Sequence, residues 1–263
     1  MKTFIRFLIG QILLTASLAH AAEVIPVVPI ERCFLCGSEP SLTMYWQGKE
    51  SKVLLLLIPG GEGYVGLKVG QADHHYHLYQ TLKRLTDPAL SSGKFDVVLL
   101  DSPAPLSPFP SARGSSDHMR RIESVIRHYR AKTQLPVWLM GHSAGGISIT
   151  EFLKHARRNN RLDLIGGMVV SAARNESYFN GPIGFPMLFM HHQQDGCSKT
   201  AYSVAVQSYE RVKAFSTAPV EFVTILTGTA ESRDPCVSGH HMYFGAGEEV
   251  ARQLDKFMSD IYK

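Results

Sequence analysis

The chain has 263 residues, of which 44% are hydrophobic and 19% are charged. This composition is typical of a globular protein and excludes a chain that is disordered throughout, while the length suits one large domain. The formal net charge is +4, and it falls to +2 if residues 1–22 are removed, because they hold Lys2, Arg6 and no acid. Such a small charge argues against nucleic acid or an anionic membrane as a partner.

Residues 1–22 have the pattern of a secretory signal peptide. Lys2 and Arg6 form a short basic start, an apolar run extends from Phe7 to Leu18, and residues 19–22 read Ala-His-Ala-Ala, a small-residue cleavage signal. The apolar run is short for a membrane span of about 20 residues, so an uncleaved anchor is the less favoured alternative. We expect a periplasmic or secreted protein, with a mature domain of residues 23–263 and no stable membrane insertion after cleavage.

Patterns of buried strands alternate with helical patterns along the mature chain. Residues 23–40 contain prolines and cysteines and are expected to lie extended on the surface. Short apolar runs predict buried strands, and apolar residues at helical spacing predict helices. Strands are expected at 52–58, 95–100, 135–140, 165–171, 186–191 and 220–226, helices at 73–85, 116–133, 146–158, 199–215 and 248–262, and a Pro- and Ser-rich loop at 102–114.

This alternation predicts a mostly parallel sheet flanked by helices on both faces. In such sheets the functional loops lie beyond the carboxyl ends of the strands. We therefore looked for chemistry in the segments that follow each predicted strand.

A candidate nucleophile follows the strand predicted at 135–140. Residues 141–145 read Gly-His-Ser-Ala-Gly and lead directly into a predicted helix. A G-x-S-x-G sequence between a strand and a helix is typical of a nucleophile elbow, in which small neighbours let the serine occupy a tight turn at a helix N-terminus. Ser143 is the predicted nucleophile.

By this motif and its order of elements the chain resembles the α/β-hydrolase superfamily, over about residues 42–261. The resemblance implies a single-domain α/β-hydrolase fold, with a mostly parallel sheet flanked by helices. It also implies a serine–acid–histidine triad in that chain order, with the acid after a later strand and the histidine after the last strand. No cofactor is implied.

Both remaining triad members occur at the implied places. Asp195 is the one carboxylate in the loop after the strand at 186–191, and two histidines occupy the loop before the final helix. His241, followed by Met242 and Tyr243, is similar to the His-small-aromatic setting of dienelactone-hydrolase-like proteins. His240 follows a glycine, as in the Gly-His ending of the wider superfamily. We favour His241 as the general base and keep His240 as the alternative.

The resemblance also implies an oxyanion hole made of two backbone N–H groups. One belongs to the residue after the nucleophile, which is Ala144. The other comes from the loop after an earlier strand, where residues 59–63 read Pro-Gly-Gly-Glu-Gly. Gly61 is the expected donor, with Glu62 as the alternative.

The mature chain contains four cysteines, an even number that favours disulfides in an exported protein. Cys197 lies two residues after Asp195, and Cys236 lies five residues before His241. If the acid and base loops meet, a Cys197–Cys236 disulfide would join them. Cys33 and Cys36 would then pair locally, and a redox role for that pair is the rival interpretation.

Histidine clusters leave a metal site as a competing hypothesis. His74, His75 and His77 lie close together, and His191, His192, Asp195 and His240 could also ligate a metal. Adjacent histidines point to different sides of a helix, and the second set competes with the triad. We predict that no metal is bound.

The segment from Ala173 to Phe185 is too short to hold a helical lid. We expect an open site, walled by the loop at 102–113 and by Tyr64, Tyr178 and Tyr243. The predicted activity is hydrolysis of a small-molecule ester by a carboxylesterase-like enzyme. A thioesterase, a serine peptidase and an acyltransferase use the same residues, and a non-catalytic exported binding protein of this fold is the alternative from another class. The oligomeric state does not follow from the sequence.

Overall fold

The computed structural model describes residues 22–30, 36–230 and 233–263. Cys33, and all of the predicted signal peptide except Ala22, lie outside the described residues. In the described part of the chain, no helix is both long enough and apolar enough to cross a membrane.

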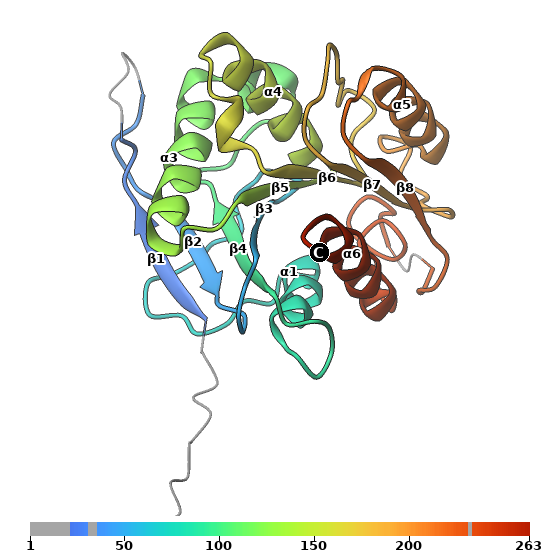
Figure 1. Cartoon of the computed structure of the whole chain (residues 1–263), viewed down its shortest axis with the longest axis horizontal. Helices are drawn as coiled ribbons and strands as arrows, with labels where there is room; N and C mark the ends of the chain where they lie inside the picture. Colours follow the sequence, from blue (N-terminus) through green and yellow to red (C-terminus); the bar gives the residue numbers. More distant parts are fainter. Residues whose placement is uncertain (1–21, 31–35, 231–232) are drawn as a thin grey trace, which may run out of the picture.

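An eight-stranded sheet forms the centre of the molecule, in the order β1-β2-β4-β3-β5-β6-β7-β8 (Figure 1). Strands β3 to β8 pair in parallel, whereas β2 pairs antiparallel with β4 and β1 pairs antiparallel with β2. The strands are β1 (Glu23–Val27), β2 (Ser41–Trp46), β3 (Val53–Ile58), β4 (Phe95–Asp101), β5 (Val137–His142), β6 (Gly167–Ser171), β7 (Met187–His192) and β8 (Val220–Ile225). The predicted mostly parallel sheet is confirmed.

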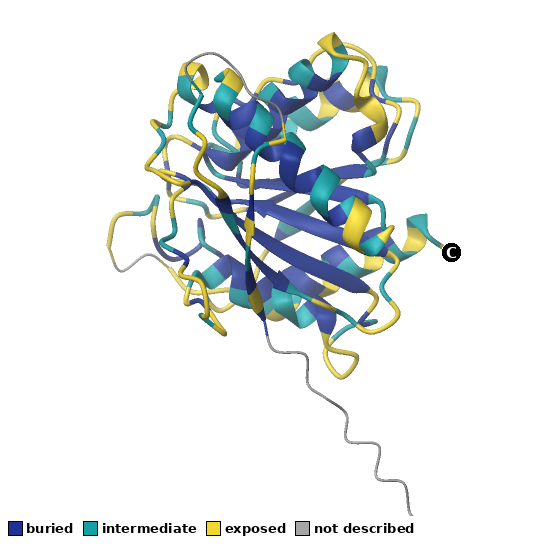
Figure 2. Ribbon diagram, turned by 90° about the vertical axis from the view of Figure 1, so that its left-hand side faces the viewer, coloured by how far each residue is buried: buried dark blue, intermediate teal, exposed yellow. Residues whose placement is uncertain are grey.

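Helices cover both faces of this sheet (Figures 1 and 2). Helices α1 (His77–Leu82) and α6 (Gly247–Ile261) pack on one face, and α3 (Ser116–Thr133), α4 (Gly145–Arg158) and α5 (Tyr202–Phe215) pack on the other. Successive side chains of a strand point to opposite faces. In β3, Val53, Leu55 and Leu57 therefore join the first core, and the residues between them join the second. Burial on both faces explains why the central strands contain continuous apolar runs.

Three local features differ from the sequence-based expectations. Strand β1 forms within residues 23–40, which were expected to lie extended at the surface, and as an edge strand it tolerates Pro26. Strand β2 follows at Ser41–Trp46, where no strand was expected. Helix α2 (Pro110–Arg113) forms within the Pro-rich loop, with Pro110 at its start.

Helix α1 starts at His77, not at residue 73, because His74 bonds locally to the backbone. The His74 Nδ1 accepts from the Tyr76 N–H, and its Nε2 lies 3.0 Å from the Val65 carbonyl. By contrast, α3 has the predicted bounds, and the Ser115 hydroxyl caps it by accepting from the His118 N–H.

Candidate functional site

Ser143 lies in a strained turn between β5 and α4. Its φ is +53°, in the left-handed region that non-glycine residues rarely adopt. Its N–H donates to the Ser171 carbonyl at 3.0 Å, and its own carbonyl accepts from the N–H groups of Gly146 and Arg174. A Cβ on Gly145 would collide with the Ile58 carbonyl, so a side chain there would push α4 away from β3. The local geometry is that of a nucleophile elbow, with a serine over the N-terminus of α4.

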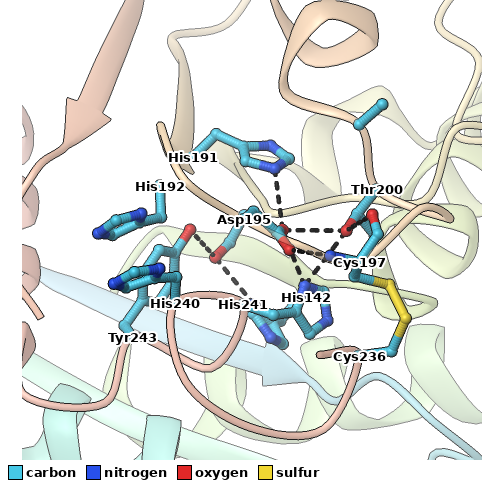
Figure 3. Close-up of polar contacts among 12 residues, drawn as sticks. His142, His191, His192, Asp195, Cys197, Thr200, Cys236, His240, His241 and Tyr243 are labelled. Atoms are coloured by element: carbon cyan, nitrogen blue, oxygen red, sulfur yellow. Dashed lines mark hydrogen bonds and ion pairs between the residues drawn. A yellow bond between two sulfur atoms is a disulfide. The ribbon is translucent and has the colours of Figure 1, made fainter. Parts of the chain in front are cut away.

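Asp195 and His241 form a buried hydrogen-bonded pair beyond the ends of β7 and β8 (Figure 3). The His241 Nδ1 donates to Asp195 Oδ2 at 2.9 Å, and both side chains are fully buried. A carboxylate only accepts hydrogen bonds, so Nδ1 carries the proton and the Nε2 of the neutral ring carries a lone pair. That Nε2 is buried and has no hydrogen-bond partner. The ring is in the tautomer that a general base requires.

Three more donors converge on Asp195. Its Oδ2 also accepts from the His191 Nε2 at 3.0 Å and from the Thr200 hydroxyl at 2.9 Å, and its Oδ1 accepts from the Cys197 N–H at 2.9 Å. Burial alone raises the pKa of the Asp195 carboxyl, but the hydrogen bonds from His191 and His241 outweigh burial and hold this pKa below its usual value. Asp195 is therefore an anion at neutral pH.

The nucleophile and the base are near each other but are not joined by a hydrogen bond. The ring of His142, the residue before Ser143, lies 5.1 Å from the ring of His241, between centroids. Among the described residues, no hydrogen bond joins Ser143 Oγ to His241. The structure thus joins the predicted acid to the predicted base by a hydrogen bond. The predicted nucleophile follows His142 in the chain, and the ring of His142 contacts the predicted base. In free enzymes, catalytic hydrogen bonds often tighten only when substrate binds.

His142 is neutral and held in one orientation. The Tyr243 hydroxyl donates to the Met190 carbonyl, and the Ser171 hydroxyl donates to the Tyr243 oxygen, so Ser171 Oγ accepts from the His142 Nδ1–H at 3.1 Å. Burial is the main cause that holds the pKa of His142 well below its usual value. Tyr243 is fully buried in this chain of hydrogen bonds, so the expectation that it walls an open site is wrong.

His240, the alternative base, does not contact Asp195. Its ring stacks on His192 at 4.0 Å between centroids with an interplanar angle of 5°, and its Nδ1 lies 3.1 Å from the Gln194 carbonyl. The geometry therefore places His241, and not His240, on the acid.

The loop after β3 approaches the nucleophile closely at Gly60. A Cβ on Gly60 would lie 2.7 Å from Ser143 Cβ and 3.3 Å from Ser143 Oγ, so only glycine fits there. Gly61 has a φ of +53°, and within the described part of the chain no acceptor takes the N–H of Gly61 or of Glu62. The two candidate donors for the oxyanion are thus unengaged in the loop that contacts Ser143.

A disulfide joins the acid and base loops. Cys197 and Cys236 are bonded at an S–S distance of 2.03 Å, with Cα atoms 4.6 Å apart (Figure 3). This is the predicted pairing between the loops that hold Asp195 and His241. The predicted partner bond of Cys36 involves Cys33, which lies outside the described residues.

The histidines do not gather into a metal site. Within residues 22–30, 36–230 and 233–263, no group of three or more His, Cys, Asp or Glu side chains is placed to hold a metal ion. His191 bonds to Asp195, whereas His192 bonds to the Thr227 carbonyl and stacks on His240.

Two features of the site were missed by the sequence analysis. His191 was given no part in the triad, yet it donates to Asp195, and its position four residues before that acid was the available signal. Arg113 was part of the predicted wall, yet it is fully buried and bonds to the loop after β3. It is the one charged residue in the segment 102–114, which was the available signal.

No family model and no curated protein matches the sequence. Solved structures resemble it along most of its length. A serine hydrolase homologue of the α/β type from Coxiella burnetii is 14% identical, with 93% of this chain and 100% of that chain covered and a TM-score of 0.59. A dienelactone hydrolase from Anabaena variabilis is 11% identical, with 92% and 99% covered and a TM-score of 0.58. A serine hydrolase without a lid from Xanthomonas campestris is 9% identical, with 92% and 95% covered and a TM-score of 0.55.

Identities this low establish the fold alone. The chain has the single-domain α/β-hydrolase fold that the sequence predicts, without a large lid.

Proposed function

We propose that this protein is an exported serine hydrolase, which cleaves an ester-type acyl bond of a small-molecule substrate through an acyl-enzyme on Ser143. One observation carries the proposal: a buried Asp195–His241 pair with a free imidazole lone pair lies near a serine held in a strained turn. A fully buried carboxylate that orients a histidine is the arrangement that nucleophilic catalysis by a serine hydroxyl requires. The solved serine hydrolases and the dienelactone hydrolase of the same fold support the same class.

In the proposed mechanism His241 Nε2 takes the proton of Ser143 as its oxygen attacks the acyl carbonyl. The Asp195 anion stabilises the imidazolium that forms. The backbone N–H groups of Ala144 and Gly61 bind the oxyanion, with the N-terminus of α4 behind them. His241 then returns the proton to the leaving group, and water, activated by the same imidazole, releases the acyl group from Ser143.

Export is part of the proposal. Its supports are the N-terminal signal pattern and the Cys197–Cys236 disulfide, since disulfides persist mainly in oxidising compartments. Secretion to the periplasm or the medium can be tested by fractionating cells and detecting the chain, with its first residue determined by sequencing. A mature chain that begins between residues 20 and 24 is expected, and a full-length chain in the cytoplasm would contradict export.

The activity is tested with p-nitrophenyl esters, acyl thioesters and peptide amides, and with a fluorophosphonate probe that labels activated serines. Ser143→Ala should lower ester hydrolysis by about 10⁴-fold or more and abolish labelling, because no other nucleophile occupies the elbow. Ser177→Ala is the matched control, because this serine is buried and, among the described residues, its hydroxyl has no hydrogen-bond partner. It should keep both activity and labelling.

The outcomes separate the alternatives. Faster turnover of thioesters or amides than of esters would replace the ester assignment by a thioesterase or a peptidase on the same residues. A folded wild-type protein that is neither labelled nor active would point to a non-catalytic binding protein, and the proposed function would be wrong.

A further inference from the structure

A buried arginine binds the loop that approaches the nucleophile. Arg113 ends α2, and its side chain is fully buried. Its Nη1 donates to the Pro59 carbonyl at 3.1 Å, and its Nη2 donates to the carbonyls of Gly60 at 3.4 Å and Gly61 at 2.7 Å. One guanidinium thus binds three successive carbonyls of the loop after β3.

The same guanidinium ties this loop to the helix that carries the nucleophile. Arg113 Nη1 also donates to the Ser148 hydroxyl of α4 at 3.1 Å. The His118 Nε2 lies 2.9 Å from that hydroxyl, and burial, followed by the charge of Arg113, lowers the pKa of His118 to about 3. The neighbour of Arg113 is therefore a neutral imidazole, which adds no charge of its own.

No carboxylate balances the charge of Arg113 among the described residues. Burial, opposed by Tyr76 and reinforced by Arg174, lowers the pKa of Arg113 to about 10. The group is therefore still a cation at neutral pH. A buried ion without a counter-ion costs free energy, and neutral dipoles compensate it only in part. A contribution to stability therefore does not explain why an arginine is buried here. An anion that forms only during a reaction would balance its charge.

The carbonyl bonds also orient the N–H groups of the loop. In a planar trans peptide the C=O and N–H bonds point in opposite directions. When Arg113 holds the carbonyls of residues 59–61, it turns the N–H groups of Gly60, Gly61 and Glu62 away from itself. The N–H groups of Gly61 and Glu62 have no acceptor in the described part of the chain. Since Gly60 packs against Ser143, the two unused donors belong to a loop in contact with the nucleophile.

We propose that Arg113 is a positioning residue for the oxyanion hole. Its guanidinium holds the loop after β3 so that the Gly61 or Glu62 N–H meets the oxygen of the tetrahedral intermediate on Ser143. Its unbalanced charge polarises those peptide groups towards the developing anion. This inference rests on the proposed function and adds to it a residue that touches neither the substrate nor the triad.

The expected kinetic signature is selective for the transition state. An oxyanion exists only after attack on the carbonyl, so a weakened oxyanion hole lowers kcat and leaves ground-state binding unchanged. Arg113→Met removes the charge and all four hydrogen bonds, and it should lower kcat by about 10²-fold, with KM changed by less than about threefold. Arg113→Lys keeps the charge but lacks the planar fork of the guanidinium. Its kcat should lie between those of the wild type and Arg113→Met.

The control is Arg121→Met. Arg121 is also a buried arginine, on α3, but it pairs with Asp117 at 2.7 Å. Its loss should lower stability and leave kcat unchanged. The rate of each protein is divided by the amount of Ser143 that reacts with the fluorophosphonate probe. A variant of which only a fraction is unfolded therefore keeps a wild-type kcat per labelled site.

The decisive measurement is the affinity of two inhibitors for each variant. A boronic acid, which forms a tetrahedral adduct on serine, should lose affinity in proportion to kcat/KM across wild type, Arg113→Lys and Arg113→Met. The carboxylic acid product, which makes no oxyanion, should bind all three proteins with the same affinity.

Equal kcat per labelled site in wild type and Arg113 variants would overturn the inference while the hydrolase proposal stands. If Arg113→Met does not fold, the same comparison is decided by Arg113→Lys, which avoids an uncharged group beneath the carbonyls. An inactive, unlabelled wild type would instead mean that the proposed function itself has failed.

Discussion

The adjacent residues His240 and His241 lie in one loop, but their rings contact different groups. His241 donates to a buried carboxylate, whereas His240 stacks on another imidazole and faces the Gln194 carbonyl. The Asp195 carboxylate both orients His241 and stabilises the imidazolium that a general base becomes. At this scale the roles of the two residues can be separated by matched substitutions.

We expect His241→Ala to lower kcat/KM for esters by about 10³-fold or more, because it removes the proton acceptor. His240→Ala should lower it by less than about tenfold. Steady-state kinetics at pH 8 checks both, alongside thermal unfolding to show that each variant is folded. The reverse ranking would make His240 the base.

At the scale of elements, the site is assembled from loops at the carboxyl ends of β5, β7 and β8, and a covalent bond holds two of those loops together. Cys197 and Cys236 are 39 residues apart in sequence. Cys197 also donates its N–H to Asp195 Oδ1. The disulfide therefore restrains both the folding of the loops and the position of the acid.

Replacing both cysteines by alanine should lower the free energy of unfolding by up to about 4 kcal/mol, the chain-entropy value for a closed loop of this length. Activity should fall as well, because the acid and base loops become free to separate. Urea unfolding of wild type and variant, each with and without reductant, measures the effect. Reductant should weaken the wild type more than the variant, in which only the predicted local pair of Cys33 and Cys36 is left to reduce. Equal stability of the two proteins without reductant would show that the Cys197–Cys236 bond does not stabilise the fold.

At the scale of the whole molecule, the interior contains several neutral histidines as well as an apolar core. His118 is buried, and burial together with the charge of Arg113 lowers its pKa to about 3. His142 is buried too, and its pKa is also well below its usual value. In the unfolded chain both take up protons near pH 6.5. Between pH 6.5 and their folded pKa values the unfolded state binds more protons, so stability falls as the pH falls.

The free energy of unfolding should therefore decrease between pH 7 and pH 4.5, and His118 should contribute about 1.4 kcal/mol of that decrease per pH unit below pH 6.5. His118→Gln keeps a hydrogen-bonding group beside Ser148 but cannot titrate. It should remove about 2–3 kcal/mol of that decrease, measured by urea unfolding at both pH values. Parallel pH profiles for the two proteins would show that His118 contributes nothing to acid sensitivity.

Much of the architecture could be predicted because its causes are local. A strand buried on both faces is mostly apolar, as β3 and residues 97–100 of β4 are, so it is visible in the sequence. An amphipathic helix with a serine cap, such as α3, can be given its bounds from the sequence for the same reason. The strained turn at Ser143 also needs small neighbours in sequence, so its motif is visible. Strand β1 was missed because it lies at the edge of the sheet, is only partly buried and contains Pro26. Strand β2 was missed because Ser41 and Thr43 interrupt its apolar pattern.

By itself, then, the sequence determined the order of the elements, the elbow and a short set of candidate acids and bases. Only the tertiary structure decided which histidine meets Asp195, that His191 and Thr200 share that carboxylate, and that Arg113 lies beneath the loop after β3. The physical reason is that these contacts join segments far apart in sequence, or depend on where a side chain points. Neither composition nor periodicity carries that information, because it is set by how strands and helices pack against one another.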